Sequence, residues 1–130
     1  MAGLKGAGPV TPDTLVALAS PGNTIAGLVR IGQTTDAEWG PRTAINMPAL
    51  ITTVGEMAQA LETVASKAGT DLLDWTPDEN IRRIVKSWPG RVESARARAL
   101  GLVADRDFLT VVRDYIRENP EAIKIPVKTA

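Results

Sequence analysis

The feature that most limits the fold of this chain is how few of its segments have the character of a β-strand. Three short stretches qualify: residues 14–19 (TLVALA), 43–48 (TAINMP) and 71–75 (DLLDW). The first is an apolar run of strand length, and the second alternates weakly between apolar and polar residues. Two or three strands form only a small sheet, which needs cover or neighbouring strands to be stable. The pattern therefore indicates an incomplete sheet.

Helical spacing and cap signals predict five helices around these strands. The strongest begins with Thr53-Val54-Gly55-Glu56, which has the spacing of a capping box, and ends at Gly69. The other four are predicted at residues 20–34, 76–88, 92–100 and 107–118, and a polar loop is predicted at residues 36–42. The order is strand, helix, strand, helix, strand and then three helices. This order indicates an α/β fold with few short strands and five helices.

Length and turn residues predict one domain with loose ends. A chain of 130 residues is of single-domain size. Glycine and proline dominate its start, so residues 1–13 are expected to be a flexible N-terminal lead. Residues 14–119 are expected to form a single α/β unit. Asn119-Pro120 ends the last helix, and residues 120–130 are expected to be a loose tail.

Composition excludes several kinds of chemistry. The chain has no cysteine, so it has no disulfide, no thiolate metal site and no thiol nucleophile. It has no histidine, the usual general base and zinc ligand. No carboxylates are paired at a spacing diagnostic of acid–base catalysis, although a carboxylate-only magnesium site is left open. We therefore assign no catalytic, cofactor-binding or metal-binding residue.

Charge and hydropathy bear on location and partners. Fifteen basic and fifteen acidic side chains give zero net charge, so no long-range field attracts nucleic acid or an anionic membrane. Every apolar stretch is interrupted well before the ~20 residues that a membrane span needs. Residues 1–10 lack the apolar core of a signal peptide. Together with the missing cysteines, these features favour the cytoplasm.

Two motif-like segments have simpler explanations. Gly3-Leu4-Lys5-Gly6-Ala7-Gly8 resembles a phosphate-binding loop, but only two residues precede it and no strand can lead into it. A flexible N-terminus is the favoured interpretation. Tyr115 is followed four residues later by Asn119, which cannot lower the phenol pKa as a lysine would. Tyr115 lies on an apolar helical stripe and is expected in the core.

A basic cluster runs from Arg82 to Arg98. Six basic residues fall within 17 positions that hold one acid: Arg82, Arg83, Lys86, Arg91, Arg96 and Arg98. Arginine binds phosphates and carboxylates well. Acidic residues just upstream can neutralise much of this charge, and the nearby Trp75 and Trp88 are expected in the core rather than free to stack on bases. A solvated or partner-facing surface is favoured over a nucleic-acid site.

Ser20, Asn23 and Thr24 gather where a helix begins after a strand. In α/β folds this place often provides ligand contacts. Capping of the helix explains Ser20 equally well, because a serine at this position accepts a hydrogen bond from the first turn. The two interpretations are weighed evenly.

Five segments in a fixed order carry a resemblance to a known family. They are Ala19-Ser20-Pro21, Ala44-Ile45-Asn46-Met47-Pro48, Thr53-Val54-Gly55-Glu56-Met57, Ile84-Val85-Lys86-Ser87-Trp88-Pro89-Gly90, and Ala95-Arg96-Ala97-Arg98-Ala99-Leu100-Gly101. With the helix after them, they cover residues 19–118. This region resembles the C-terminal half of an extended short-chain dehydrogenase/reductase of the NAD-dependent epimerase/dehydratase family. The subgroup that it resembles is that of the D-erythronate dehydrogenase-like sugar-acid dehydrogenases.

The resemblance implies a division of labour. In this family the N-terminal half holds the glycine-rich NAD loop and the Ser…Tyr-x-x-x-Lys set, neither of which this chain contains. The chain then corresponds to the substrate-binding, sheet-completing part of an extended Rossmann-type dehydrogenase and is expected to be inactive alone. NAD is implied for the full-length family and not for this chain. The implied substrate is a small sugar acid, and the implied partner is a cofactor-binding half or a full-length homologue.

The resemblance also implies site residues. It assigns substrate-side roles to Ser20 and to Trp88. The subgroup tends to have arginine after Ser-Pro, a contact for a substrate carboxylate, where this chain has Gly22. Two other functions stay open: a stand-alone module that docks on a partner protein and, less favoured, a small nucleic-acid binder using the Arg82 to Arg98 cluster.

Overall fold

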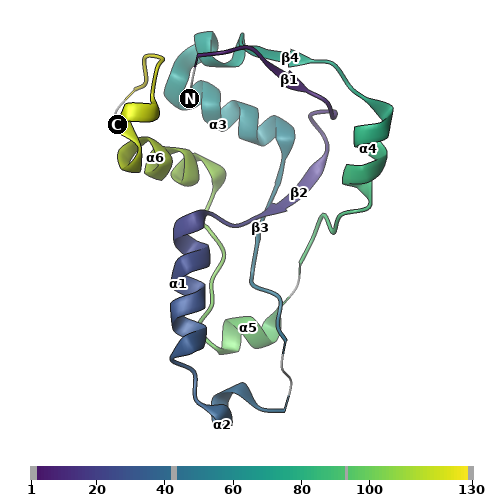
Figure 1. Ribbon diagram of the computed structural model, residues 1–130. Helices are drawn as coiled ribbons and strands as arrows, with labels where there is room; N and C mark the ends of the chain where they lie inside the picture. Colours follow the sequence, from purple (N-terminus) through teal and green to yellow (C-terminus); the bar gives the residue numbers. More distant parts are fainter. Residues whose placement is uncertain (1–2, 42–43, 93, 129–130) are drawn as a thin grey trace.

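The computed structural model describes residues 3–41, 44–92 and 94–128, and its elements fall into an upper group and a lower arm (Figure 1). The upper group contains β1 (Gly6–Gly8), α3 (Val54–Thr70), β4 (Leu73–Trp75), α4 (Glu79–Lys86), α6 (Phe108–Glu118) and the short 3₁₀ helix η1 (Pro120–Ala122). The lower arm contains α1 (Pro21–Gly32), α2 (Asp36–Trp39) and α5 (Ala95–Ala99). The strands β2 (Leu15–Leu18) and β3 (Leu50–Thr53) join the two groups. The five predicted helices are confirmed; α3 extends to Thr70, one residue past its predicted end, and the other four have shorter bounds.

The ribbon of β2 and β3 is antiparallel, with Leu15 opposite Thr53 and Leu18 opposite Leu50. The strand predicted at residues 14–19 is confirmed as β2. The strand predicted at residues 43–48 is wrong in position. Among the described residues 44–49 no strand is formed, and the pairing with β2 begins at Leu50; residue 43 lies outside the described residues. A strand exists only where a second strand accepts its hydrogen bonds, and β2 reaches residues 50–53 instead.

A second ribbon, of β1 and β4, is parallel, with Gly6 opposite Leu73 and Gly8 opposite Trp75. The strand predicted at residues 71–75 is confirmed as β4. β1 lies inside the segment predicted as a lead, because a glycine-rich stretch has no strand propensity of its own. Glycine suits the pairing, since a Cβ at Gly8 would lie 2.8 Å from the indole ring of Trp75. The domain boundaries at residues 13/14 and 119/120 stay predictions.

Helix α3 is the central element of the upper group and packs against α6. Its start follows the sequence signal. The Thr53 hydroxyl accepts from the Glu56 N–H at 3.1 Å, and the Glu56 carboxylate accepts from the Thr53 N–H at 2.8 Å. The Thr53 N–H, followed by the Thr52 hydroxyl that donates to the same carboxylate at 2.8 Å, lowers the pKa of Glu56. The helix is kinked at Ser66, whose φ of 57° and ψ of −177° are not helical.

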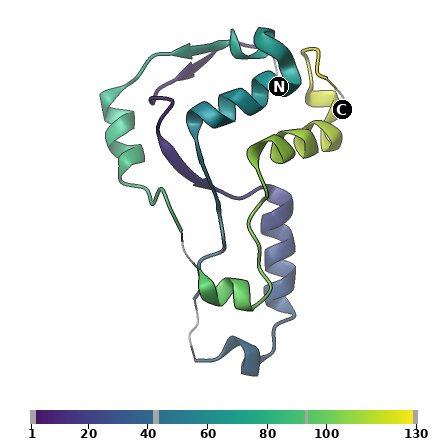
Figure 2. The same cartoon turned by 180° about the vertical axis from the view of Figure 1, so that it is seen from behind.

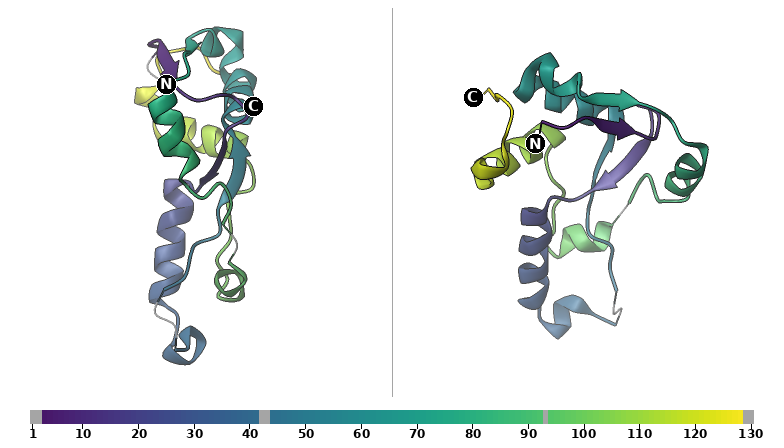
Figure 3. Two further views of the ribbon diagram at one scale, coloured as in Figure 1. Left: turned by 90° about the vertical axis from the view of Figure 1, so that its right-hand side faces the viewer. Right: turned by 45° about the horizontal axis from the view of Figure 1, so that its top comes forward.

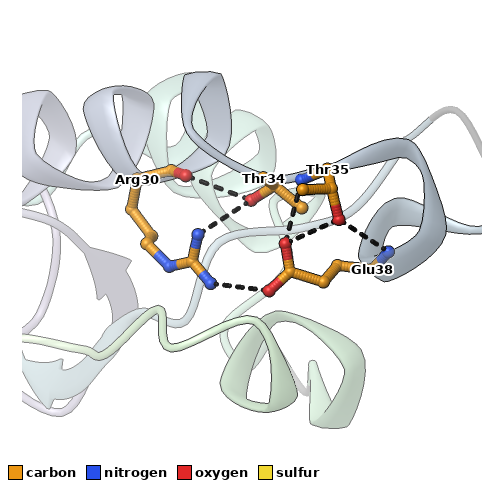
Figure 4. A network of polar contacts seen from close by, with 4 residues as sticks. All are labelled: Arg30, Thr34, Thr35 and Glu38. Atoms are coloured by element: carbon orange, nitrogen blue, oxygen red, sulfur yellow. Dashed lines mark hydrogen bonds and ion pairs between the residues drawn. The ribbon is translucent and has the colours of Figure 1, made fainter.

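The short helix α2 corrects the prediction of a polar loop at residues 36–42; Arg42 lies outside the described residues. Thr35 and Glu38 form a second capping box, with Thr35 N–H donating to Glu38 at 2.9 Å (Figure 4). The guanidinium of Arg30, in α1, lies 3.5 Å from an oxygen of the same Glu38 carboxylate and so forms an ion pair between α1 and α2. The Thr-x-x-Glu spacing was the signal for this helix.

The hydrophobic core is small and divided. Its members among the described residues are Val10, Ala60, Val64 and Ala65 in the upper group, and Ala97, Leu100 and Leu102 in the lower arm. The accessible surface is 8620 Å². A compact monomer of this mass exposes about 6600 Å², so the excess is about 2000 Å². Figure 3 shows the cause: edge-on, the molecule is thin, and α1 extends away from the upper group.

Several side chains expected in the core are at the surface. Trp88 is 61% exposed, Tyr115 44% and Trp75 38%. Trp75 lies on β4, which pairs only with β1 among the described strands, Tyr115 lies on α6, which packs on α3, and Trp88 follows the end of α4. The apolar patterns were correct signals of burial, but the described chain does not supply enough partners to bury them.

Candidate functional site

Ser20 is held at the start of α1 by a distant carboxylate. Its N–H donates to Asp105 at 2.7 Å and its hydroxyl donates to the other carboxylate oxygen at 2.6 Å. The same hydroxyl oxygen accepts from the N–H of Asn23 at 3.1 Å, and the Asn23 amide donates to the Val103 carbonyl at 2.9 Å. Ser20 is therefore the cap of α1 and joins that helix to residues 103–105. One lone pair of its oxygen is left to accept from a ligand.

An apolar cavity of about 300 Å³ reaches Ala19, the residue before Ser20, but Ser20 is not one of its lining residues. Its walls come from three segments: β2 and Ala19, residues 47–49, and Trp88 with Pro89 and Val92. Ser20 directly follows Ala19 in the chain. The structure thus brings Trp88 and the end of β2 that leads into Ser20 to one cavity, although they are far apart in sequence.

A second cavity, of about 370 Å³, is also lined by Trp88 and has a mixed polar and apolar lining. Thr11, Asp13, Arg82 and Lys86 line it, and Leu15 and Trp88 are shared with the apolar cavity. A hydrogen bond from Thr11 lowers the pKa of Asp13, with smaller contributions from its own backbone and from Arg82 and Lys86. Trp88 therefore lines both an apolar cavity and one that contains two cations and a carboxylate.

The basic residues from Arg82 to Arg98 do not form one patch. Arg82, Arg83 and Lys86 belong to α4, while Arg96 and Arg98 belong to α5, and Figures 1 and 2 show these helices well apart. Several of these side chains are engaged within the chain. Arg82 pairs with Glu79 at 2.8 Å, and Arg96 stacks on Trp39 with 5.1 Å to the ring centroid and donates to the Trp39 carbonyl. The arrangement matches structural and solvated roles.

An apolar hollow of about 560 Å³ on the upper group lies between β1, β4, α3 and α6. Trp75, Phe108 and Tyr115 line it. Tyr115 has no lysine one turn later; Asn119 caps the end of α6 by donating its side-chain amide to the Tyr115 carbonyl at 3.0 Å. The hollow offers hydrophobic surface and almost no polar groups.

Within the described residues no three histidine, cysteine, aspartate or glutamate side chains are grouped closely enough to share a metal ion. None of the helices in the same part of the chain combines the length and apolar character needed to cross a bilayer.

Comparison with known proteins decides between the family resemblance and a chance pattern. No protein-family model matches the chain. A D-erythronate dehydrogenase from Cupriavidus necator is 34% identical over 110 residues, which cover 85% of this chain and 34% of that protein. The chain is a relative of the D-erythronate dehydrogenases. A second D-erythronate dehydrogenase, from Haemophilus influenzae, is 31% identical over 108 residues, 83% of this chain and 34% of that protein.

This relative of the D-erythronate dehydrogenases therefore spans about a third of the length of the curated proteins that it matches. Comparison with solved structures gives the same result as comparison of sequences. The nucleoside-diphosphate-sugar epimerase from Agrobacterium tumefaciens has a TM-score of 0.87 at 30% identity, covering 94% of this chain and 36% of that one. The L-threonine 3-dehydrogenase from Trypanosoma brucei shares the fold, with a TM-score of 0.76 at 21% identity, covering 96% of this chain and 38% of that one. The predicted resemblance and the α/β fold class are confirmed.

The residue that sequence reasoning missed in this D-erythronate dehydrogenase relative is Asp105. It lies 85 positions after Ser20 and makes both of the hydrogen bonds that fix that residue. No local pattern marks it, because a carboxylate in a loop before a helix is commonplace. Only the folding of residues 103–105 against the start of α1 reveals it.

Proposed function

We propose that the chain is the substrate-binding portion of an NAD-dependent dehydrogenase that oxidises a sugar acid, and that it works only with a cofactor-binding portion. The observation that carries the proposal is the similarity to two D-erythronate dehydrogenases over a third of their length. Hydride transfer needs a nicotinamide placed against the substrate carbon, and NAD would be bound outside this chain. The residues here would bind and orient the acid.

Ser20 and Trp88 are the proposed substrate-side residues. Trp88 is 61% exposed and lines both cavities, so the carbon face of a sugar acid can lie against its indole. The free lone pair of Ser20 can accept from a substrate hydroxyl while Asp105 fixes its position. Arg82 and Lys86 in the second cavity can attract the carboxylate.

A chimera tests this proposal. The 110 matched residues of the Cupriavidus necator D-erythronate dehydrogenase are replaced by the corresponding part of this chain. We expect the chimera, but not the 130-residue chain alone, to reduce NAD in the presence of D-erythronate. Trp88→Ala in the chimera should raise KM about tenfold, and Trp88→Phe, which keeps an aromatic face, should raise it less. NAD reduction by the chain alone would overturn the proposal.

Gly22 provides a second variant. It lies in the first turn of α1, and a Cβ built on it meets no atom within 4 Å, so a long side chain fits there. The resemblance places an arginine at this position. Gly22→Arg in the chimera should lower KM for D-erythronate about tenfold, because a guanidinium binds a carboxylate through two hydrogen bonds. Gly22→Gln, which introduces a long side chain without charge, is the control and should leave the KM for D-erythronate unchanged.

A stand-alone module that docks on another protein is the second candidate. The excess exposed surface and the hydrophobic side chains on it favour this function as much as the first. Two measurements distinguish these candidate functions. A stand-alone module is expected to unfold cooperatively as a monomer when the 130-residue chain is studied alone. It is also expected to give an inactive chimera.

A further inference from the structure

We propose that Asp13 is a specificity-determining residue, whose carboxylate accepts hydrogen bonds from hydroxyl groups of the substrate and so selects a polyhydroxy acid over a simple hydroxy acid. The proposal rests on the proposed function, since it takes a sugar acid as the ligand of the second cavity, which Asp13 lines together with Arg82, Lys86 and Trp88. It names the group that recognises the end of the ligand farthest from its carboxylate.

The first observation is that the backbone around Asp13 is held in place. Asp13 lies in the turn between β1 and β2, on the side of the upper group where α4 lies (Figure 1). On either side of it, the carbonyls of Pro12 and Thr14 accept from the N–H groups of Gly55 and Val54 in α3, at 2.7 and 3.0 Å. Gly55 permits this approach, because a Cβ there would lie 3.0 Å from the Pro12 oxygen. These bonds fix the turn without using the Asp13 side chain.

The second observation is that the second cavity contains charges of both signs from different elements. Arg82 and Lys86 come from α4, whereas Asp13 comes from the turn before β2. Among the described residues no ion pair joins Asp13 to either cation; Arg82 pairs with Glu79 at 2.8 Å, and Lys86 forms no ion pair. Asp13 and Lys86 are exposed, and Arg82 is half-buried. The cations and the carboxylate are therefore within reach of a ligand and are not paired with one another.

The third observation is the capacity of Asp13 to accept hydrogen bonds. Thr11 donates to the Asp13 carboxylate, and this bond, followed by one from its own backbone, lowers the pKa of Asp13. The side chain is therefore ionised at neutral pH, and an ionised carboxylate is an acceptor only, with about four lone-pair positions on its two oxygens. Positions remain for two hydroxyl donors of a ligand.

These groups match the two ends of a sugar acid. The carboxylate of such a ligand suits Arg82 and Lys86, and the hydroxyl groups on its other carbons suit Asp13. A site that provides an acceptor for a hydroxyl group rejects an analogue without that group, because the acceptor is then left without a partner. D-2-hydroxybutanoate is such an analogue, since it has the carboxylate and four carbons of D-erythronate but no hydroxyl group on C3 or C4.

Comparison of these two acids tests the proposal. We use the chimera described above, joined before β1 so that it includes Asp13, and measure KM for D-erythronate and Ki for D-2-hydroxybutanoate as a competitive inhibitor. Asp13→Ala should raise KM about tenfold or more and leave Ki unchanged. Asp13→Asn should raise KM less, because its amide oxygen still accepts a hydrogen bond. A purely structural role of Asp13 predicts equal increases in KM and Ki.

Two control variants separate recognition of the hydroxyl groups from other effects. Lys86→Met should raise KM and Ki together, because both acids have a carboxylate. Asp74→Ala removes an exposed carboxylate of β4 outside the cavity and should change neither constant. If Asp13→Ala lowers the urea midpoint of the chimera, the comparison is made with Asp13→Asn, which keeps the shape of the side chain.

The outcomes separate this proposal from the proposed function. An active chimera in which the Asp13 variants leave KM unchanged, or raise KM and Ki equally, overturns the role of Asp13 and leaves the proposed function standing. An inactive chimera overturns the proposed function, and calorimetric titration with the two acids then tests Asp13 without turnover. Weaker binding of D-erythronate alone in Asp13→Ala supports the role of Asp13. Equal effects on both acids, or no binding of D-erythronate, overturn it.

Discussion

At the scale of single residues, the backbone strain of α3 is concentrated at Ser66. A φ of 57° with ψ of −177° is a conformation that essentially only glycine adopts without cost. We expect Ser66→Gly to stabilise the chain by about 1 kcal/mol, since relief of ~1–3 kcal/mol of strain exceeds the extra entropy that glycine loses on folding. Urea unfolding measures this change. Ser66→Ala keeps a Cβ in the strained conformation and should give no gain; equal gains would place the effect elsewhere.

Asp107 makes the stability of the chain depend on pH. As the cap of α6 it accepts from the Thr110 N–H at 2.7 Å, and this bond, followed by that from Arg106, lowers its pKa to about 2. Because the pKa in the folded chain is below the ordinary value of 3.8, the cap adds stability above that pH and loses it as pH falls toward 2. The urea concentration at the unfolding midpoint should therefore decrease as the pH is lowered from 4 to 2. In the Asp107→Asn variant, whose side chain still caps the helix but does not titrate, this decrease should be smaller.

At the scale of elements, Arg96 joins α5 to other parts of the lower arm. Arg96 of α5 stacks on Trp39 of α2 and donates to the carbonyls of Trp39 and Ala44. Lysine has no planar group with which to stack and bridge at once. Arg96→Lys should speed amide exchange in α2 several-fold, as measured by mass spectrometry, with Arg91→Lys on the exposed surface as the matched control. An unchanged α2 would show that the Thr35–Glu38 capping box holds this helix by itself.

At the scale of the whole molecule, the dominant fact is uncovered apolar surface. Large hydrophobic side chains such as Leu28, Val29 and Ile84 are more than half exposed. We expect the lone chain to bind the dye ANS strongly and to self-associate at high concentration, and the chimera to bind far less dye. Leu28→Glu should reduce dye binding by the lone chain. A lone chain that stays monomeric, ignores the dye and unfolds cooperatively would favour the stand-alone module.

The local structure of this protein was determined by its sequence. Helix starts at Ser20, Thr53 and Asp107 follow from side chains that satisfy the N–H groups of their own first turn, so three or four neighbouring residues suffice to predict them. The short helix α2 could have been predicted in the same way. The family resemblance was also readable, because it depends on the order of several short segments.

Pairing and burial were decided only by the tertiary structure. Gly6–Gly8 is a strand because Leu73–Trp75 pairs with it, and residues 44–49 are not one because no strand of the described chain pairs with them. Trp88 is exposed and Ser20 is fixed by Asp105 for the same reason. Strand pairing, burial of a face and a long-range hydrogen bond each require a second segment of the chain. The amino-acid sequence of one segment does not show which other segment will lie against it in the fold.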